Sequence, residues 1–231
     1  MTEYRDRTFH SVVDRGGSLS IHDIACHNCS FQNCALSLTK DPAKRSSVTG
    51  ATLRNCTVAA SDIGPAILRR VNIDGLITDS LFIIWGALFH QVTLSGRIGK
   101  VKINTHVHHS DQTPETQRPF DAQRHEFYLQ TDWALDISQA KVRLLEISGI
   151  PARLIRRDAS SQMIVRRERA LQPDWRSHLG PENKHWPFSI DMFLSGGEPD
   201  RILVAPQLGP KKQTEQLLRD LRELRDLGVV E

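Results

Sequence analysis

The chain has 231 residues, enough for one large domain or two small ones with an apolar core. An apolar content of 39%, a charged content of 25% and a net charge of +3 are ordinary for a folded soluble protein and argue against the acidic surface of a DNA mimic. No apolar run approaches the ~18 residues of a membrane span, so we expect no membrane partner. The polar opening MTEYRDRTFH does not fit a signal peptide, and four unevenly placed cysteines fit reduced thiols, so we expect a cytoplasmic location.

A five-residue period runs through residues 19–38 and 46–105. Cut from Leu19, the chain reads LSIHD, IACHN, CSFQN and CALSL, and the register resumes at Ser46 for twelve more pentads. Ten of the twelve third positions are aliphatic, and the first positions are mostly small or apolar. A helix would show a period of 3.6 and a strand a period of 2. The pattern therefore predicts a square coil, one pentad per side, with the third and first residues of each pentad turned inward.

Two interruptions affect this register. The pentads LFIIW and QVTLS fit poorly, and a one-residue slip near Gln91 is an alternative because Val92 and Leu94 could then point inward. A further block of four pentads covers residues 135–154. All blocks together predict about five coils, stacked at a strand spacing of roughly 4.8 Å.

The pentads CSFQN, SDIGP and VNIDG resemble the pentapeptide-repeat family. The resemblance implies a mainly β fold, a right-handed quadrilateral parallel β-helix, in a protein that we expect to be bacterial. We expect the β-helix over residues 19–154, with an insertion at 106–134 and a small α+β cap at 155–231. Some members of the family are acidic rods that mimic DNA and protect topoisomerases. This basic chain, with few coils and a large non-repeat part, departs from that pattern.

The cysteines fall on inward positions of the period. Cys26 stands at a third position, and Cys29, Cys34 and Cys56 stand at first positions. We therefore expect core thiols that behave as small hydrophobes. The alternative is a zinc site formed by Cys26, Cys29 and Cys34, although a second pair of ligands is missing.

Three aromatic residues, Phe82, Trp85 and Phe89, fall on outward positions. Exposed aromatics in such a cluster indicate either cover by the insertion or docking of a partner protein. The insertion opens with His106–His109, which is either a polar loop or a metal-binding stretch. Thr113 and Pro114 are typical of a helix start, and the aromatic residues that follow predict a short helix laid against the coil.

Residues 153–169 are the most basic stretch of the chain. The apolar runs at 154–155 and 163–165 predict a hairpin. The arginines around them are either an anion or nucleic-acid contact or a fringe of the sheet paired with nearby acids. These candidate binding residues are Arg153, Arg156, Arg157, Arg166 and Arg167.

The remaining segments predict a small folded cap. Trp175, Trp186 and Phe188 are expected to anchor irregular segments onto a core, or alternatively to form a hot spot for a partner. Residues 201–206 are expected to form a buried strand. Residues 211–228 predict an amphipathic helix that ends at Gly228. Its apolar stripe either caps the last coil or forms a homodimer contact.

The function that these features favour is a non-enzymatic scaffold that binds another protein. Whether the chain is an enzyme stays open, although the sequence contains no nucleophile elbow, P-loop or metalloprotease helix. The alternatives are nucleic-acid or anion binding through the arginines, and a carbohydrate-acting enzyme built on a β-helix. No cofactor or metal is expected.

Overall fold

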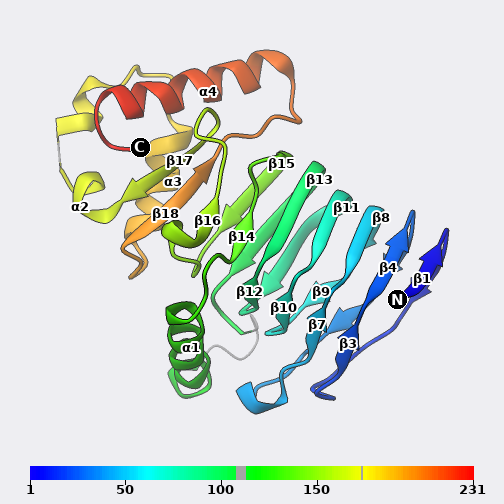
Figure 1. Cartoon of the computed structure of the whole chain (residues 1–231). Helices are drawn as coiled ribbons and strands as arrows, with labels where there is room; N and C mark the ends of the chain where they lie inside the picture. The colour runs from blue at the N-terminus through cyan, green and yellow to red at the C-terminus, as the bar shows by residue number, and fades with distance from the viewer. Residues whose placement is uncertain (108–112, 173) are drawn as a thin grey trace.

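The computed structural model describes residues 1–107, 113–172 and 174–231. The fold is mainly β, as the sequence predicted, and its largest sheet has twelve strands paired in parallel (Figure 1). These strands are β1 (Thr2–Arg5), β2 (Thr8–His10), β4 (Ile24–His27), β5 (Ser30–Gln32), β6 (Ala35–Leu36), β8 (Thr52–Ala59), β9 (Asp62–Ile63), β11 (Asn72–Trp85), β13 (Val92–Asn104), β14 (Leu135–Asp136), β15 (Ala140–Ile147) and β16 (Ile155–Arg156).

Two smaller sheets complete the β structure. A four-stranded parallel sheet has the order β12-β10-β7-β3, and a two-stranded antiparallel sheet pairs β17 with β18. Their strands are β3 (Ser20–His22), β7 (Ser47–Thr49), β10 (Ile67–Arg69), β12 (Leu88–His90), β17 (Gln162–Arg166) and β18 (Asp200–Val204).

The pentad centres pair with one another across neighbouring strands. Leu53 of β8 pairs with Cys26 of β4 on one side and with Ile73 of β11 on the other. In the four-stranded sheet, Val48 pairs with Leu68 about 20 positions later. Equivalent positions of successive pentad blocks therefore lie side by side. The parallel pairing begins at Thr2, earlier than the expected start at residue 19.

In most pentads up to residue 75, the fifth residue adopts a left-handed backbone conformation. The φ angles are 49° at Asp23, 53° at Asn28 and 53° at Asn33, and the series continues at Gly50, Asn55, Ala60, Arg70 and Gly75. Glycine tolerates this region without penalty, and asparagine and aspartate tolerate it better than other residues. Some of these residues follow the end of a strand, as Asn28 follows β4 and Asn33 follows β5, whereas Asn55 and Gly75 lie within the longer strands β8 and β11. This local chemistry explains why several strands of two to four residues recur at five-residue intervals.

One extra residue before Ile84 shifts the register of the chain as far as Gly96, and the expected centres are regained at Ile98 and Ile103, which pair with Val142 and Ile147. Ile84 pairs with Ile63, and Phe89 pairs with Leu68, so each lies one position beyond the expected centre. The left-handed residues move by the same step, to Gly86, Gln91 and Gly96. The slip anticipated near Gln91 is thus present, but it starts earlier in the chain.

Helix α1 (Pro114–Leu129) lies in the expected insertion, and its start is as predicted. The hydroxyl of Thr113 accepts a hydrogen bond from the backbone N–H of Thr116, and Pro114 follows in the first turn. The Phe120 side chain is buried. The sequence therefore specified both the cap and the inward aromatic face of this helix.

Helix α1 packs on the outside of the four-stranded sheet. The Tyr128 hydroxyl accepts a hydrogen bond of 3.3 Å from the backbone N–H of Phe89 in β12. The guanidinium of Arg69 in β10 lies 5.3 Å from the centre of the Phe127 ring. The predicted contact between this helix and the repeat is thereby confirmed.

The predicted hairpin between residues 154–155 and 163–165 is wrong, although both segments are strands. β16 extends the large parallel sheet by pairing with β14, whereas β17 pairs with β18. β18 confirms the strand expected near residues 201–206 and separates two apolar cores. Ile202 and Val204 face the core of the parallel sheet, and Leu203 and Ala205 face a second core.

The second core is closed by the helices beyond β17. These are α2 (Arg167–Ala170), α3 (His185–Leu194) and α4 (Lys211–Asp226), and the short 3-10 turns of the chain are Pro42–Lys44, Ala152–Leu154 and Asp174–His178. Leu221 and Leu224 of α4 are fully buried in this core, and Gly228 follows the helix with a φ of 74°. The amphipathic stripe of α4 is therefore used inside the chain, which leaves the expected homodimer contact without its apolar surface.

Figure 1 shows how these parts are arranged. The parallel strands run in order from β1 at one end of the molecule to β15 and β16 at the other, and β17, β18 and the three C-terminal helices lie beyond that second end. None of the helices in the described ranges combines the length and apolar character needed to cross a membrane.

Candidate functional site

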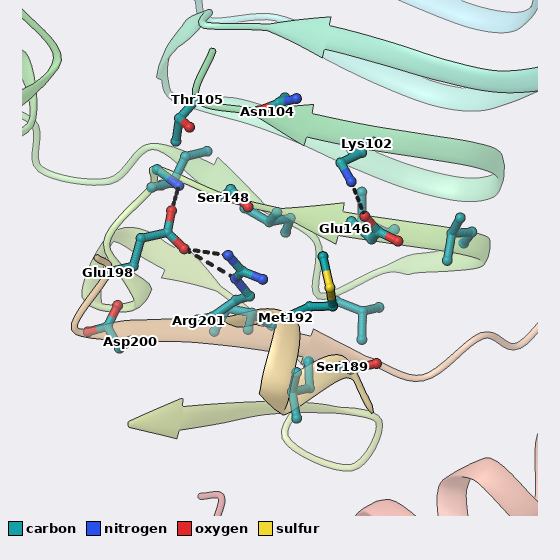
Figure 2. Close-up of a pocket in the computed structure, with 18 of the residues that line it drawn as sticks. Lys102, Asn104, Thr105, Glu146, Ser148, Ser189, Met192, Glu198, Asp200 and Arg201 are labelled. Atoms are coloured by element: carbon teal, nitrogen blue, oxygen red, sulfur yellow. Dashed lines mark hydrogen bonds and ion pairs between the residues drawn. The ribbon is translucent and has the colours of Figure 1, made fainter. Parts of the chain in front are cut away.

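A cleft separates the last strands of the parallel sheet from the C-terminal part of the chain. Its volume is about 890 Å³, and its walls come from β13 and β15 on one side and from α3 and β18 on the other. In Figure 2, Lys102 and Glu146 lie on the first wall, and Met192, Glu198 and Arg201 lie on the second.

The first wall is the outward face of two neighbouring parallel strands. Lys102 and Glu146 are register partners and form an ion pair of 2.8 Å. The residues that follow them, Ile103 and Ile147, point into the core and are almost fully buried. The alternation of a strand thus places the charged pair in the cleft, where each charge neutralises the other.

The second wall is joined to the first through Glu198. One carboxylate oxygen accepts a hydrogen bond from the backbone N–H of Gly149, and the other binds the Arg201 guanidinium at 2.8 and 3.2 Å. The Asp200 carboxylate accepts a bond of 2.9 Å from the backbone N–H of Ala152. These contacts connect β18 to the loop after β15, so the two walls keep a defined separation.

Helix α3 supplies an apolar rim to the cleft. Trp186, Ile190 and Phe193 share one helical face and are buried in the second core. Phe188 and Met192, four residues apart, share the opposite face and are 66% and 53% exposed. Both line the cleft. Large exposed apolar side chains that cluster beside a concave surface are typical of an interaction site.

Both ends of α3 are held by other segments. The indole N–H of Trp186 donates to the backbone oxygen of Leu217 in α4 at 2.9 Å. Arg167 donates to the backbone oxygens of Phe193 and Leu194 at 3.3 and 3.1 Å. A cation at a helix C-terminus satisfies free carbonyls and opposes the negative end of the dipole. The apolar rim is therefore mounted on a well-anchored helix.

Two of the described histidines, His106 and His185, line the cleft. Burial lowers the pKa of His185 at the start of α3, which favours the neutral imidazole. Nδ1 of His106 lies 2.9 Å from the side-chain oxygen of Asn104. His108 and His109, which completed the candidate metal stretch, lie outside the described residues. Across the parts of the chain that the structure describes, no group of three or more His, Cys, Asp or Glu residues is placed to hold a metal.

The first two candidate arginines, at 153 and 156, are exposed but engaged. Arg153 donates to the backbone oxygen of Tyr128 at 3.2 Å. Arg156 stacks over Trp133, with its guanidinium 4.1 Å from the ring centre. Both contacts connect the end of the parallel sheet to the segment that follows α1.

The other three arginines also have partners within the chain. Arg157 donates to the backbone oxygen of Gln162 at 2.7 Å, and Arg166 forms a two-pronged ion pair with Glu231 at 2.6 and 2.9 Å. Arg167 holds the end of α3. Of the five arginines, Arg166 alone forms an ion pair between described residues, with Glu231, and the other four contact backbone oxygens or an aromatic ring. An anion or nucleic-acid contact through these residues stays a prediction.

The aromatic docking surface expected at residues 82–89 is not exposed. Phe82 and Trp85 are 8% exposed, and Phe89 is 2% exposed. For Phe82 and Phe89 the outward assignment was wrong because the extra residue before Ile84 moves both onto inward positions. Phe89 consequently occupies the centre of β12, where it pairs with Leu68.

The thiols lie where the period placed them. Cys26, Cys29 and Cys56 are at most 2% exposed and belong to the main core, whereas Cys34 is half-buried. All four are free. The prediction of core thiols is confirmed for Cys26, Cys29 and Cys56 but not for the half-buried Cys34.

Of the two rim residues, the sequence pointed to Phe188, as an anchor or a partner hot spot together with Trp175 and Trp186, but not to Met192. Trp175 and Trp186 are buried, as expected of anchors, whereas Phe188 is 66% exposed. The spacing of Phe188 and Met192, opposite the buried face of the same helix, was the signal that could have identified them.

Comparison of the chain with family models, with curated proteins and with solved structures found no match. No relative therefore suggests a function for the cleft, so its function has to be inferred from the side chains that line the cleft. The charged groups described on its walls already have partners, and its most exposed large side chains are apolar. Such an arrangement can bind an apolar group between polar edges.

Proposed function

We propose that the chain is a non-enzymatic scaffold that binds a partner protein in the cleft between β15 and α3. The observation that carries the proposal is the exposure of Phe188 and Met192 above a concave surface. Transferring such side chains from water into a contact is worth roughly 1.5–3 kcal/mol each. Large apolar anchors surrounded by polar residues are the usual composition of an energetic centre in a protein interface.

The occupant that fits is a protein segment that presents one or two apolar side chains. These side chains would lie between the rim and the outward face of β13 and β15. The Lys102–Glu146 pair, 35% and 50% exposed, would form part of a polar border that excludes a wholly apolar partner. A charged small molecule is a poorer fit because the charged side chains described on the cleft walls, Lys102, Glu146, Glu198 and Arg201, are already paired with one another.

We further propose that the repeat is a right-handed quadrilateral β-helix of about five coils, similar to pentapeptide-repeat proteins. Pairing of pentad centres about 20 residues apart supports four sides per coil. The left-handed fifth residues support a corner after each side. In this account the coil is the rigid platform and the cap positions the rim of the binding cleft.

The proposal is tested by affinity capture from the native host with three baits, wild-type protein, Phe188→Ala/Met192→Ala and Leu171→Ala. Leu171 is 60% exposed but does not line the cleft, so its variant is a matched loss of exposed apolar surface. We expect one stoichiometric protein with wild type and Leu171→Ala. Its affinity should fall at least about 30-fold with the double variant, since two interface anchors are lost. Equal recovery with all three baits would overturn the proposal.

A further inference from the structure

The β1 end of the parallel sheet is uncovered, in contrast to the end covered by the C-terminal helices (Figure 1). Among the described strands, β1 pairs only with β4. Residues of the first layer that point toward the core are only partly buried, as at Tyr4, Phe9 and Ile21. Further apolar side chains at this end are largely exposed, namely Val12 at 58%, Val13 at 43% and Leu19 at 46%. An open strand edge beside apolar surface is a template for pairing with another strand.

The backbone groups available on this edge can be identified. The N–H groups of Thr2 and Asp6 donate to the backbone oxygens of Asp23 and His27 at 2.8 and 2.9 Å. Successive residues of a strand direct their N–H and C=O groups to alternate sides. The even-numbered residues of β1 therefore face β4, and Glu3 and Arg5 direct their backbone groups to the open side.

We propose that a second copy of this chain pairs with β1 in an antiparallel arrangement, with a two-fold axis at Tyr4. In this register Glu3 lies opposite Arg5 of the second copy, and Arg5 lies opposite its Glu3. Both pairs are of the hydrogen-bonded type, because Glu3 and Arg5 carry the outward N–H and C=O groups. The arrangement forms four backbone hydrogen bonds and two ion pairs from one short strand.

Charge selects this register over its neighbours. A symmetric antiparallel pair that keeps Tyr4 on the inner face can be centred on Glu3, Tyr4 or Arg5. Centring on Glu3 places two carboxylates opposite each other, and centring on Arg5 places two guanidinium groups opposite each other. Like charges directly opposite are destabilising. Only the Tyr4-centred register places opposite charges at both positions.

Little is lost by rearranging the charges that this register uses. Arg5 and Glu3 form an ion pair with each other within one chain, but their side chains are 64% and 42% exposed. Exposed ion pairs contribute little to stability. Pairing across the interface also places Tyr4 of each copy beside the other, which continues the inner apolar row. This interface is at the opposite end from the cleft, so it does not depend on the proposed function.

The test is sedimentation velocity of wild-type protein, Glu3→Arg, Arg5→Glu and an equimolar mixture of the two variants. We expect the wild-type dimer to have a dissociation constant below about 100 µM. The dissociation constant of each variant alone should be at least about tenfold higher, since both ion pairs become repulsive. The mixture should regain the dimer, because the four opposed charges are complementary again. Arg143→Glu makes the same charge reversal as Arg5→Glu at an exposed position of β15, far from β1, and this control variant should dimerise like wild type.

A second variant separates the backbone contribution from the charges. Glu3→Pro removes an N–H that faces the open side, so it should abolish the dimer while leaving the β1–β4 hydrogen bonds in place. A wild type that stays monomeric at about 100 µM would overturn the proposal and mean that the charges protect the edge. A dimer that survives in Glu3→Arg alone would equally exclude this register.

Discussion

The guanidinium of Arg45 lies 4.7 Å from the centre of the Phe120 ring, so a buried cation connects the loop before β7 to helix α1. Arg45 also donates to the backbone oxygens of Pro65 and Gly86 at 2.6 and 2.8 Å. Burial lowers its pKa to about 10, which reflects the cost of placing the charge there. The Arg45 side chain thus contacts the inserted helix at Phe120 and the pentad repeat at Pro65 and Gly86, and so joins the two.

Replacing Arg45 by methionine should lower the free energy of unfolding by about 2–4 kcal/mol. The methionine fills much of the same space, but it leaves two buried carbonyl oxygens without donors, each at a cost of about 1–3 kcal/mol. Urea denaturation of Arg45→Met against Arg54→Met, at an exposed arginine, measures the effect. A loss equal to that of the exposed control would mean that Arg45 does not hold the helix.

The cysteines should differ strongly in reactivity. Burial, together with the neighbouring thiols of Cys29 and Cys56, raises the pKa of Cys26 to about 12. Cys34 is half-buried. At about pH 8, alkylation of the native protein should therefore be at least about tenfold faster at Cys34 than at Cys26, because the thiolate is the reactive species. Peptide mass spectrometry after timed iodoacetamide treatment reads the rates, and equal rates would contradict the packing of the thiols.

Asp14 should make stability depend on pH. Burial raises the pKa of its carboxyl group, but the hydrogen bonds from Ser46, Gly17 and Ser37 together lower the pKa by more than burial raises it. The pKa of Asp14 therefore lies below its usual value. The stabilisation is then complete above the unfolded pKa of about 4 and is lost as the pH falls through the folded value.

Asp14→Asn should therefore be less stable than wild type at neutral pH, with the difference shrinking as the solution becomes more acidic than about pH 4. Urea unfolding across this range measures it. Asp62→Asn, at an exposed carboxylate, is the control. A difference that stays constant with pH would show that the hydrogen bonds do not depend on ionisation.

Truncating the rim of the cleft should leave the fold intact. Phe188 and Met192 are mostly exposed, so the unfolding free energy of Phe188→Ala and of Met192→Ala should each change by less than about 0.5 kcal/mol. Truncating Phe193, which is fully buried on the same helix, should cost about 3–5 kcal/mol. Thermal and urea unfolding of the three variants provide the comparison. Equal losses would mean that α3 does not present the two faces described.

The five-residue period allowed most of the repeat to be predicted. It placed Cys26, Leu53 and Ile73 in one row, and the structure pairs them so. It failed between Thr78 and Ile98, because an added residue moves the inward position from Ile83 to Ile84. A run of apolar residues such as LFIIW satisfies both registers, so hydrophobicity alone could not distinguish them. The positions of residues suited to a left-handed turn, such as Gly86 and Gly96, carried that information.

The cleft could not be predicted from the sequence because it depends on contacts between distant segments. Glu198 meets Gly149, and Arg166 meets Glu231, through pairs that no local pattern connects. The pairing of β16 with β14 and of β17 with β18, in place of a β16–β17 hairpin, likewise depends on the position of β18, which lies about 35 residues further along the chain. Local signals such as the Thr113 cap and the Gly228 helix end were predicted correctly because each involves only a few consecutive residues.

The most direct test of the proposed binding cleft is site-specific photo-crosslinking from position 189 in the native host. Ser189 lies between Phe188 and Met192 in the chain and lines the cleft, and a crosslinker at position 171 serves as the control. The account predicts a single protein crosslinked from position 189, absent from position 171 and lost when Phe188 and Met192 are both alanine. No protein at position 189, or the same protein from both positions, would contradict it.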